Sequence, residues 1–257
     1  MKIVAQLFFF VLIMTSCKGQ TSFGKPEVDP ETIQLKFMDW WTYQYKSIML
    51  SRDFVAIDVA SKEITKDAFI NELTLGNFIP IKLESSDGKI YYQLFRINPK
   101  SDSSIKATIT QVAFDEYKNL KLEGTKFPDF SFKDLDGNLL TNDAMKGKIV
   151  VIKCWYIHCA ACIKEFPNVN ALAAKYKDRN DMIFVSLAED TPEQLKVFLA
   201  KKPLSYSVIP NMKKYMNETL SLNSFPTHFI LDKEGKIAKV LTNYESLEVA
   251  LEKESRK

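Results

Sequence analysis

The sequence predicts an α/β protein in which the C-terminal half alternates strands and helices and the N-terminal half forms a smaller α+β unit. An apolar run at residues 149–152 is typical of a buried strand. Apolar residues then recur at steps of three and four from Ile163 to Leu172, as on one face of a helix. A second apolar run, at residues 182–188, is followed by a helical stretch at residues 191–200. Such alternation of strands and helices is typical of the α/β class.

Residues 1–16 are typical of a signal peptide. Lys2 supplies a positive charge, and the apolar core that follows, residues 3–14, is too short to span a membrane. Cys17 comes directly after two small residues, as in a bacterial lipobox, which predicts a lipidated cysteine at the start of the mature chain. The alternatives are plain cleavage and a retained anchor. In each case the chain leaves the cytosol, and our prediction is the periplasm, with a lipid anchor at Cys17 in the bacterial cell envelope.

Residues 17–28 are short and polar, which predicts a lipidated tether, and residues 29–122 are long enough for a small α+β domain of their own. Asp29-Pro30-Glu31 is typical of a helix start, and Gly76 of a helix end. Asp87-Gly88 between two apolar runs predicts a hairpin. In chain order we expect a helix from residue 29, a helix at 65–75, strands at 78–83 and 90–97, and a helix at 104–120. This unit contains no catalytic motif, so its role stays open.

Four aromatic residues lie close together in the first expected helix: Trp40, Trp41, Tyr43 and Tyr45. They form either part of a core or a surface that binds a partner. We expect core packing and keep partner binding as the alternative. The net charge of +3 decides nothing about partners, and no basic cluster in the sequence indicates nucleic acid.

Residues 123–257 are expected to form the second domain, after a boundary at 123–128. Asp136-Gly137-Asn138 and Lys233-Glu234-Gly235 are each expected between paired strands, and Thr191-Pro192 is typical of a helix start. The expected strands are at 130–132, 139–140, 148–154, 182–188, 206–209, 227–231 and 236–242. The expected helices are at 159–177, 191–200, 212–220 and 246–254.

A pair of cysteines, Cys159 and Cys162, lies where the strand at 148–154 gives way to a helix. This order places the first cysteine at the helix N-terminus, where free backbone N–H groups and the positive end of the helix dipole stabilise a thiolate. Two cysteines three residues apart can also form a disulfide across one helical turn. The sequence therefore predicts a site that cycles between a dithiol and a disulfide.

This segment resembles the thioredoxin-fold oxidoreductases of the TlpA/ResA type, whose usual pattern is W-x-x-W-C-x-P-C-x-x-E-x-P. The residues that match the pattern are Trp155, Cys159, Cys162, Glu165 and Pro167. Pro226, in S-F-P-T-H-F, matches the cis-proline of the family. The resemblance covers residues 125–254 and implies a thioredoxin-like fold, in which helices flank a central mixed sheet.

By this resemblance, Cys159 attacks a substrate disulfide and Cys162 resolves the mixed disulfide that forms. Phe225, Pro226 and Thr227 are expected to lie against the cysteines, with the backbone before the cis-proline turned outward to pair with a substrate peptide. The implied partners are protein disulfides and an upstream electron donor in the membrane, and we expect no cofactor and no bound metal. The predicted function is extracytoplasmic reduction of protein disulfides.

Some residues depart from the family pattern. Ala161 replaces the proline between the cysteines. His158 stands where the family has a tryptophan, and it either lowers the pKa of the neighbouring cysteine or only fills the space. Lys153 occupies the position of the buried acid of thioredoxin, so Glu165 is the one nearby carboxylate that could move the proton of the resolving cysteine, unless it faces solvent. We expect Lys153, His158 and Glu165, together with Trp155, to tune the site.

Three further residues belong to the expected site or lie beside it. Pro167 is predicted to kink the helix that follows the cysteines. His228, two residues after the proline of the F-P-T motif, points to one face of the next strand and either approaches the site or has a structural role. Cys154 is expected to pack as a small buried hydrophobic residue.

Two other functions remain as alternatives. A peroxiredoxin-like peroxidase needs the pattern P-x-x-x-[ST]-x-x-C, and Trp155-Tyr156 leaves no serine or threonine at the required place. A copper-binding protein of the Sco type uses C-x-x-x-C and a histidine; the cysteine spacing here is one residue short, although His158 and His228 are available. A zinc site is disfavoured because neither a second C-x-x-C nor H-x-x-x-H follows.

Overall fold

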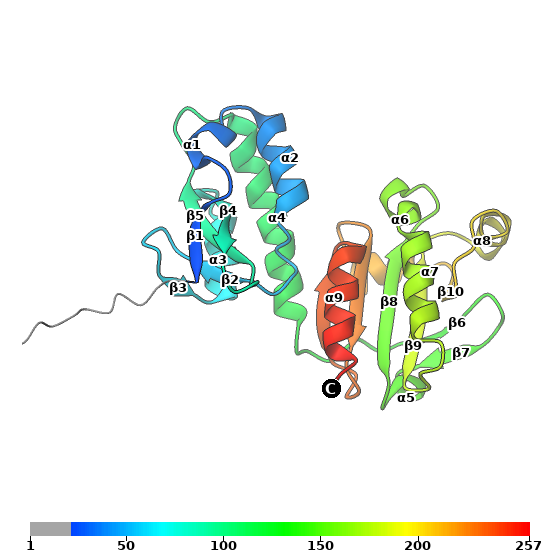
Figure 1. Cartoon of the computed structure of the whole chain (residues 1–257). Coiled ribbons are helices and arrows are strands. Elements are labelled where there is room, and N and C mark those ends of the chain that lie inside the picture. Colours follow the sequence, from blue (N-terminus) through cyan, green and yellow to red (C-terminus); the bar gives the residue numbers. More distant parts are fainter. Residues whose placement is uncertain (1–21) are drawn as a thin grey trace, which may run out of the picture.

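The computed structural model describes residues 22–257. The predicted signal peptide and Cys17 lie outside the described residues. The described chain forms two units, each built on its own five-stranded sheet (Figure 1). This arrangement confirms the predicted α/β class with a separate small domain in the N-terminal half. Among the helices of residues 22–257, none combines the length and the apolar character that a membrane span requires.

The N-terminal unit packs its helices against a sheet with the strand order β1-β4-β5-β2-β3. Its strands are β1 (Phe23–Pro26), β2 (Val55–Ile57), β3 (Glu63–Ile64), β4 (Phe78–Ser85) and β5 (Tyr91–Arg96). Its helices are α1 (Pro30–Ile33), α2 (Phe37–Ser47), α3 (Lys66–Thr74) and α4 (Ser103–Leu122). Large side chains such as Trp40, Phe69 and Ile79 are fully buried in its core. This unit therefore has a hydrophobic core of its own.

The sequence patterns do not predict β1, β2 or β3, the three shortest strands of this sheet. Strand β1 corrects the prediction of a tether at residues 17–28, because it pairs antiparallel with β4 and places Phe23 opposite Ser85. Strand β2 pairs with β5, and β3 pairs with β2. Segments of two to four residues are too short to show the alternation by which a strand is recognised.

The single helix expected from residue 29 is two helices, because the chain turns at Gln34 after α1. The Gln34 side-chain amide donates to the Pro30 carbonyl at 2.7 Å and accepts a hydrogen bond from the Asn98 N–H at 2.9 Å. These two bonds fix the turn, and α2 begins again at Phe37. After this change of direction, α2 runs beside α4 (Figure 1).

The aromatic cluster divides between the core and the surface. Trp40 is fully buried, and Tyr43 is buried with its hydroxyl oxygen accepting a hydrogen bond from the Lys82 N–H at 2.7 Å. Trp41 is half-buried, and Tyr45 is 74 % exposed. Core packing is therefore confirmed for Trp40 and Tyr43 and is wrong for Tyr45.

The second unit is built on a mixed sheet of order β10-β9-β8-β11-β12. Its central strand β8 (Ile149–Trp155) runs parallel to β9 (Met182–Ala188) and antiparallel to β11 (Thr227–Leu231). The other strands are β6 (Ser131–Lys133), β7 (Leu139–Thr141), β10 (Ser207–Ile209) and β12 (Ile237–Leu241). The helices are α5 (Asn142–Met145), α6 (Ala160–Lys164), α7 (Phe166–Lys175), α8 (Pro192–Leu199) and α9 (Tyr244–Glu254), with a short π-helix, η1 (Tyr215–Thr219). The thioredoxin-like architecture implied by the resemblance is confirmed.

Every residue of β8 is buried, which explains why residues 149–152 are all apolar instead of alternating between apolar and polar. Val150 and Ile152 contribute to one core, and Ile149 and Val151 to the core on the opposite face. Helices α7 and α9 lie together in front of the sheet in Figure 1 and cover that second face. Lys153 is the one charged residue of β8, and it is fully buried as well. Its burial requires a partner, which the site provides.

The helix expected at 159–177 is interrupted at Glu165, which ends α6 and precedes α7. Pro167 lies in the first turn of α7 and has no N–H to donate, so the predicted kink is confirmed. The helix expected at 212–220 is mainly the π-helix η1, in which the Leu220 N–H donates to the Tyr215 carbonyl five residues earlier.

The two units contact each other where α4 packs against β12, the strand at one edge of the second sheet (Figure 1). Lys239 on β12 lies 3.0 Å from Asp53 and 3.0 Å from Glu123. Arg52 donates to the Ser246 hydroxyl at 3.2 Å. The N-terminal unit is therefore held against the second unit by side-chain contacts as well as by the chain that joins them.

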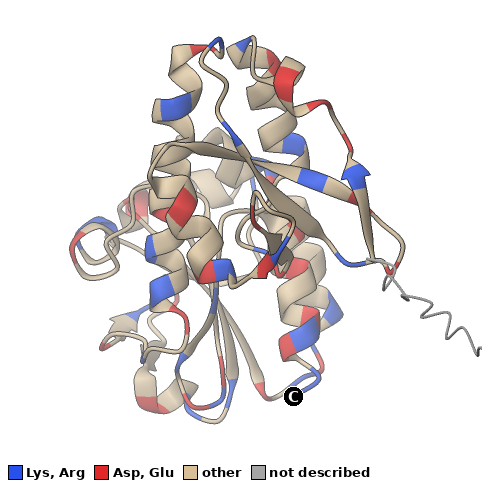
Figure 2. Ribbon diagram, turned by 90° about the vertical axis from the view of Figure 1, so that its left-hand side faces the viewer, with Lys and Arg blue, Asp and Glu red and all other residues tan. Residues whose placement is uncertain are grey.

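Charged residues of both signs are interspersed along the helices and strands of both units (Figure 2). The whole chain carries a net charge of only +3. Neither observation indicates the basic surface that a nucleic-acid partner requires.

Candidate active site

The two cysteines of the C-x-x-C motif form a disulfide at the start of α6. Cys159 is the N-cap residue of this helix, and Cys162 lies in its first turn. Their sulfur atoms are bonded at 2.01 Å, and the Cys162 N–H donates to Cys159 Sγ at 3.1 Å. Cys159 is 5 % exposed, whereas Cys162 is fully buried. Of the two residues, Cys159 is therefore the more accessible from solvent.

Trp155 and Phe166 pack together in the apolar cluster that surrounds the disulfide. Trp155 is fully buried, and its ring meets the ring of Phe166 edge-on with the centroids 5.0 Å apart. The free thiol of Cys154 lies on the opposite face of β8, and burial raises its pKa well above the usual range. The prediction of a buried, inert Cys154 is confirmed by this placement.

The peptide bond between Phe225 and Pro226 is cis, as the family resemblance implies. Thr227, the next residue, begins β11 and lies opposite Cys154 in the sheet. Phe225 packs against the cluster that contains both cysteines, and its ring meets that of Tyr156 at 5.5 Å. The structure therefore brings the F-P-T segment and the cysteine pair together.

A buried hydrogen-bonded network lies at the junction of α6 and α7. Glu165 Oε2 accepts a hydrogen bond from Lys153 Nζ at 2.7 Å and lies 3.0 Å from His228 Nε2. The second carboxylate oxygen, Oε1, accepts from the Tyr244 N–H at 2.8 Å, at the N-terminus of α9. Lys153 and His228 are paired across β8 and β11, so both point to the same face of the sheet. Glu165 is thus turned inward, and the solvent-facing alternative is wrong.

Burial and charge set the protonation of this network. Burial alone would raise the pKa of Glu165, but the hydrogen bonds and charges of His228 and Lys153 lower it to about 2. Burial, with the nearby charge of Lys153, lowers the pKa of His228 to about 4. Burial also lowers the pKa of Lys153, against the attraction of Glu165. At neutral pH Glu165 is therefore ionised and His228 is neutral, with its Nε2–H donating to the carboxylate.

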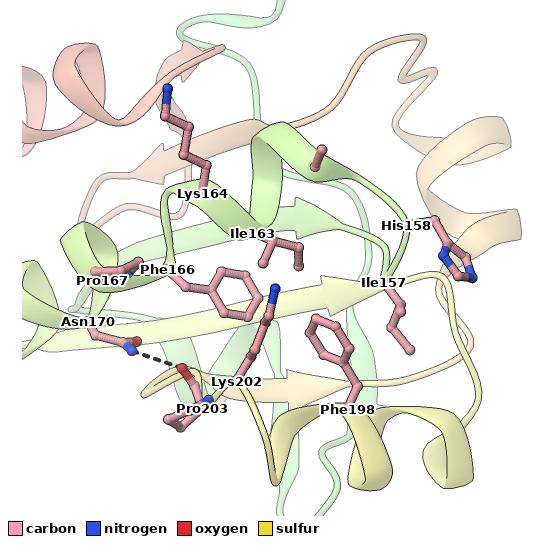
Figure 3. A pocket seen from close by; sticks show the side chains of 11 residues that line it. Ile157, His158, Ile163, Lys164, Phe166, Pro167, Asn170, Phe198, Lys202 and Pro203 are labelled. Atoms are coloured by element: carbon pink, nitrogen blue, oxygen red, sulfur yellow. Dashed lines mark hydrogen bonds between the residues drawn. The ribbon is translucent and has the colours of Figure 1, made fainter.

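A groove of about 850 Å³ runs beside the cysteines, between α6, α7 and α8 (Figure 3). Its walls are mainly apolar and include Ile157, Ile163, Phe166 and Phe198. His158 is exposed and lies at the rim, where Figure 3 shows its ring apart from the apolar side chains. His158 is therefore a surface histidine next to Cys159, which agrees with either of its two expected roles.

The sequence patterns do not predict two features of the site, because both depend on contacts between residues far apart in the chain. One is the hydrogen bond from the backbone N–H of Tyr244 to Glu165. The other is a second cleft that extends from the N-terminal unit to the cis-proline. Among residues 22–257, no cluster of three or more potential ligands is arranged to hold a metal ion.

Comparisons with known proteins identify the family of this chain. The model of the redoxin family matches residues 122–254, just over half of the chain. The chain is 29 % identical over 141 residues to the thiol-disulfide oxidoreductase ResA of Bacillus cereus, a match that covers 55 % of this chain and 81 % of that protein. It is 32 % identical over 120 residues to the thioredoxin-like protein YneN of Bacillus subtilis, covering 46 % of this chain and 70 % of that protein.

Among solved structures, the thioredoxin domain of a thiol-disulfide oxidoreductase from Bacteroides vulgatus is similar, with a TM-score of 0.47 and 24 % sequence identity. This similarity covers 51 % of this chain and 96 % of that one. The chain therefore belongs to the redoxin family and is a thiol–disulfide oxidoreductase of the ResA type.

Proposed function

We propose that this protein works outside the cytoplasm and reduces protein disulfides through Cys159 and Cys162. The observation that carries the proposal is the Cys159–Cys162 disulfide, which lies near a cis-proline and in which Cys159 is slightly exposed and Cys162 is fully buried. A fully buried Cys162 suits an attack within the molecule, and the more accessible Cys159 suits an attack on a substrate.

The reaction transfers two electrons and two protons from the dithiol to the substrate. The Cys159 thiolate attacks one sulfur of the substrate disulfide, so that a mixed disulfide forms and one substrate thiolate leaves and takes up a proton. The Cys162 thiol then loses its proton and attacks Cys159 Sγ, which releases the second substrate thiolate. The enzyme is left with the Cys159–Cys162 disulfide, and an external dithiol donor must reduce it again.

Glu165 has a positioning role in this proposal. A carboxylate with a pKa of about 2 is a weak base at neutral pH, so it is poorly suited to take the proton of Cys162. Its hydrogen bonds instead tie the junction of α6 and α7 to β8, β11 and α9. This network holds Cys162, three residues before Glu165, in place for the resolving attack.

The proposed location rests on the sequence. The signal peptide at residues 1–16 and Cys17 support export and a lipid anchor, and export supports an electron donor in the membrane. Labelled palmitate should be incorporated into wild type and not into Cys17→Ala. Absence of label from wild type, or equal labelling of the variant, would contradict the lipid anchor.

The cysteine roles are tested by trapping. Cys162→Ser should accumulate mixed disulfides between Cys159 and envelope proteins, because the resolving attack is lost. Cys159→Ser should trap none, and Cys154→Ala, which keeps the redox pair, should behave as wild type. Non-reducing gels and mass spectrometry of the trapped partners give the readout. Equal trapping by Cys159→Ser and Cys162→Ser would refute the two-step mechanism.

A further inference from the structure

We infer that the N-terminal unit forms part of the substrate site and that Gln44 on α2 binds the backbone of a polypeptide substrate. This inference rests on the proposed function, since the substrate is the disulfide-bearing polypeptide whose reduction we propose. A cleft lies between the two units beside the cis-proline, and a residue that lines it carries an unpaired polar group.

The cleft has a volume of about 560 Å³ and is lined from both units. Trp41, Gln44 and Tyr45 of α2 form one side. Phe225 and Pro226 of the second unit, together with Ala161 from between the two cysteines, form the other side. We call it the interdomain cleft. A molecule bound in it therefore contacts the N-terminal unit and the redox site at the same time.

Gln44 carries an unsatisfied group in the interdomain cleft. Its side chain is only 4 % exposed, and within residues 22–257 its Oε1 atom has no hydrogen-bond partner. A buried acceptor that has lost its water without gaining a donor is destabilising, so native proteins rarely keep one without a role. A rotation of the Gln44 side chain toward the cleft would let an N–H donor on a bound molecule satisfy this oxygen. A polypeptide backbone carries such a donor at every residue except proline.

The rest of the cleft also suits an extended polypeptide. Phe225 lines it, and within residues 22–257 no hydrogen bond joins the Phe225 backbone to another residue, so its N–H and C=O are free to pair with a strand. Tyr45 lies on the opposite wall and is 74 % exposed, although it is a large aromatic residue. Exposed tyrosine and tryptophan side chains are common contact residues in protein recognition. A small disulfide would touch the sulfur atoms without reaching α2.

The test compares one polypeptide with one small disulfide. The polypeptide is a synthetic peptide of about a dozen residues with a single internal disulfide, and the small substrate is bis(2-hydroxyethyl) disulfide. Gln44→Met, which keeps the side-chain length, and Tyr45→Ala should each lower kcat/KM for the peptide by about three- to tenfold, the effect of one lost hydrogen bond or one lost aromatic contact. Reduction of the small disulfide should stay within about twofold of wild type. Phe114→Ala is the control, because Phe114 is an exposed aromatic residue of α4 that does not line the cleft.

Two further measurements separate a binding role from a structural one. Gln44→Met removes a buried unsatisfied oxygen, so its Tm should be equal to or higher than that of wild type while peptide turnover falls. The backbone nitrogen atoms of the peptide are N-methylated one at a time. Methylation of the nitrogen that binds Gln44 should lower kcat/KM for wild type but cause no further loss in Gln44→Met. Unchanged peptide turnover in both variants, or an equal loss on both substrates, would overturn the inference.

The redox proposal is separated from this inference by a binding assay that needs no chemistry. The same peptide with its cysteines replaced by serine is titrated against the oxidised protein. Gln44→Met and Tyr45→Ala should raise its Kd by about the same factor as they lower kcat/KM. If wild type reduces neither substrate, the proposed function fails, yet the Kd values still decide whether the interdomain cleft binds polypeptide. Equal Kd values for wild type and both variants would refute that binding.

Discussion

The carboxylate of Glu165 receives three hydrogen bonds, and the donors come from β8, β11 and the start of α9. This arrangement explains how a lysine can occupy the middle of the central strand. Lys153 is fully buried, but Glu165 neutralises its charge, and neutral His228 adds a second donor to the carboxylate. His158, in contrast, stands in solvent, so its effect on Cys159 is reduced by screening.

His228→Gln tests the buried network through the pH dependence of stability. The folded pKa of His228 is about 4, and its ordinary value is 6.5. The unfolded chain therefore takes up a proton between pH 6.5 and 4 that the folded chain does not, so the free energy of unfolding falls as the pH falls through this window. Glutamine keeps a donor for Glu165 but does not titrate. We expect the loss of stability between pH 7 and pH 4.5, measured by urea unfolding, to be smaller in the variant than in wild type.

His158→Gln is the matched control, because this histidine is exposed and should leave the slope unchanged. Protonation of Glu165 also lowers the free energy of unfolding, but at lower pH. This loss of stability occurs as the pH falls from about 4.5 towards 2, because the pKa of Glu165 is depressed in the folded protein. The same pH slope in His228→Gln and wild type would show that His228 is not held neutral.

His158→Ala tests whether the imidazole sets the redox potential. A positive or donating group beside Cys159 stabilises the thiolate, so its removal should raise the pKa of Cys159 and make the couple more reducing. Because the ring is exposed, we expect a shift of only about 10–20 mV, which corresponds to less than about 1 kcal/mol. Equilibration with glutathione and thiolate absorbance against pH measure the two quantities. No change in either would mean that the helix terminus alone tunes the cysteine.

The helices of this protein begin and end at residues whose side chains or backbone freedom suit those positions. Thr191 caps α8 together with Gln194 in a capping box, and the proline that follows stands at the first helical position. At the other end of a helix, Gly76 follows α3 with a φ of +66°, which favours glycine. Such local signals explain why these helix ends were predicted to within about one or two residues.

Gly76→Ala should destabilise the N-terminal unit more than an ordinary glycine replacement. A Cβ atom at this position would lie 2.5 Å from Thr110 Oγ1 on α4, in addition to the strain of a positive φ. We expect a loss of about 2–3 kcal/mol in the free energy of unfolding. Gly137→Ala is the control: its φ is +87°, but no atom lies within 4 Å of the added Cβ, so about 1 kcal/mol is expected. Equal losses in urea titrations of the two variants would contradict the predicted clash.

At the scale of the whole molecule, the N-terminal unit is held against the edge of the second sheet by ion pairs that join distant parts of the chain. Lys239 and Lys253 both contact Asp53, and their positive charges lower the pKa of Asp53 to about 2 although burial acts in the opposite direction. Glu123, just after α4, also contacts Lys239. These pairs keep α2 and α4 beside the cis-proline, which is the arrangement that the interdomain cleft requires.

Lys239→Met should loosen the contact between the two units. It leaves the largely buried Glu123 without its partner and leaves Asp53 with Lys253 alone, so we expect a loss of about 1–2 kcal/mol in the free energy of unfolding and faster proteolysis near residue 123. Lys213→Met is the control, because Lys213 is exposed and its ion pair with Glu189 lies within the second unit. Equal proteolysis rates in the two variants would argue against a role of Lys239 in holding the units together.

The position of the redox pair, the kink at Pro167 and most helices and long strands can be predicted from the sequence alone. Each of these depends on residues that are close together in the chain, so hydrophobic periodicity, capping residues and the C-x-x-C spacing were sufficient. The cis-proline and the fold followed from a family resemblance that joined two such local motifs. The same reasoning could not recognise the shortest strands, whose pairing depends on neighbours far away in the chain.

The partners of the buried polar residues depend on the three-dimensional fold and cannot be predicted from the sequence. His228 and Glu165 are 63 residues apart and meet because the register of β8 and β11 places Lys153 and His228 on one face. Gln44 looks like an ordinary polar residue of a helix, and its burial beside the second unit follows from the docking of α4 on β12. Apolar periodicity indicates which face of an element is buried, but it carries no information on which element covers that face. The partners of buried polar groups are therefore set by sheet register and by the contact between the two units.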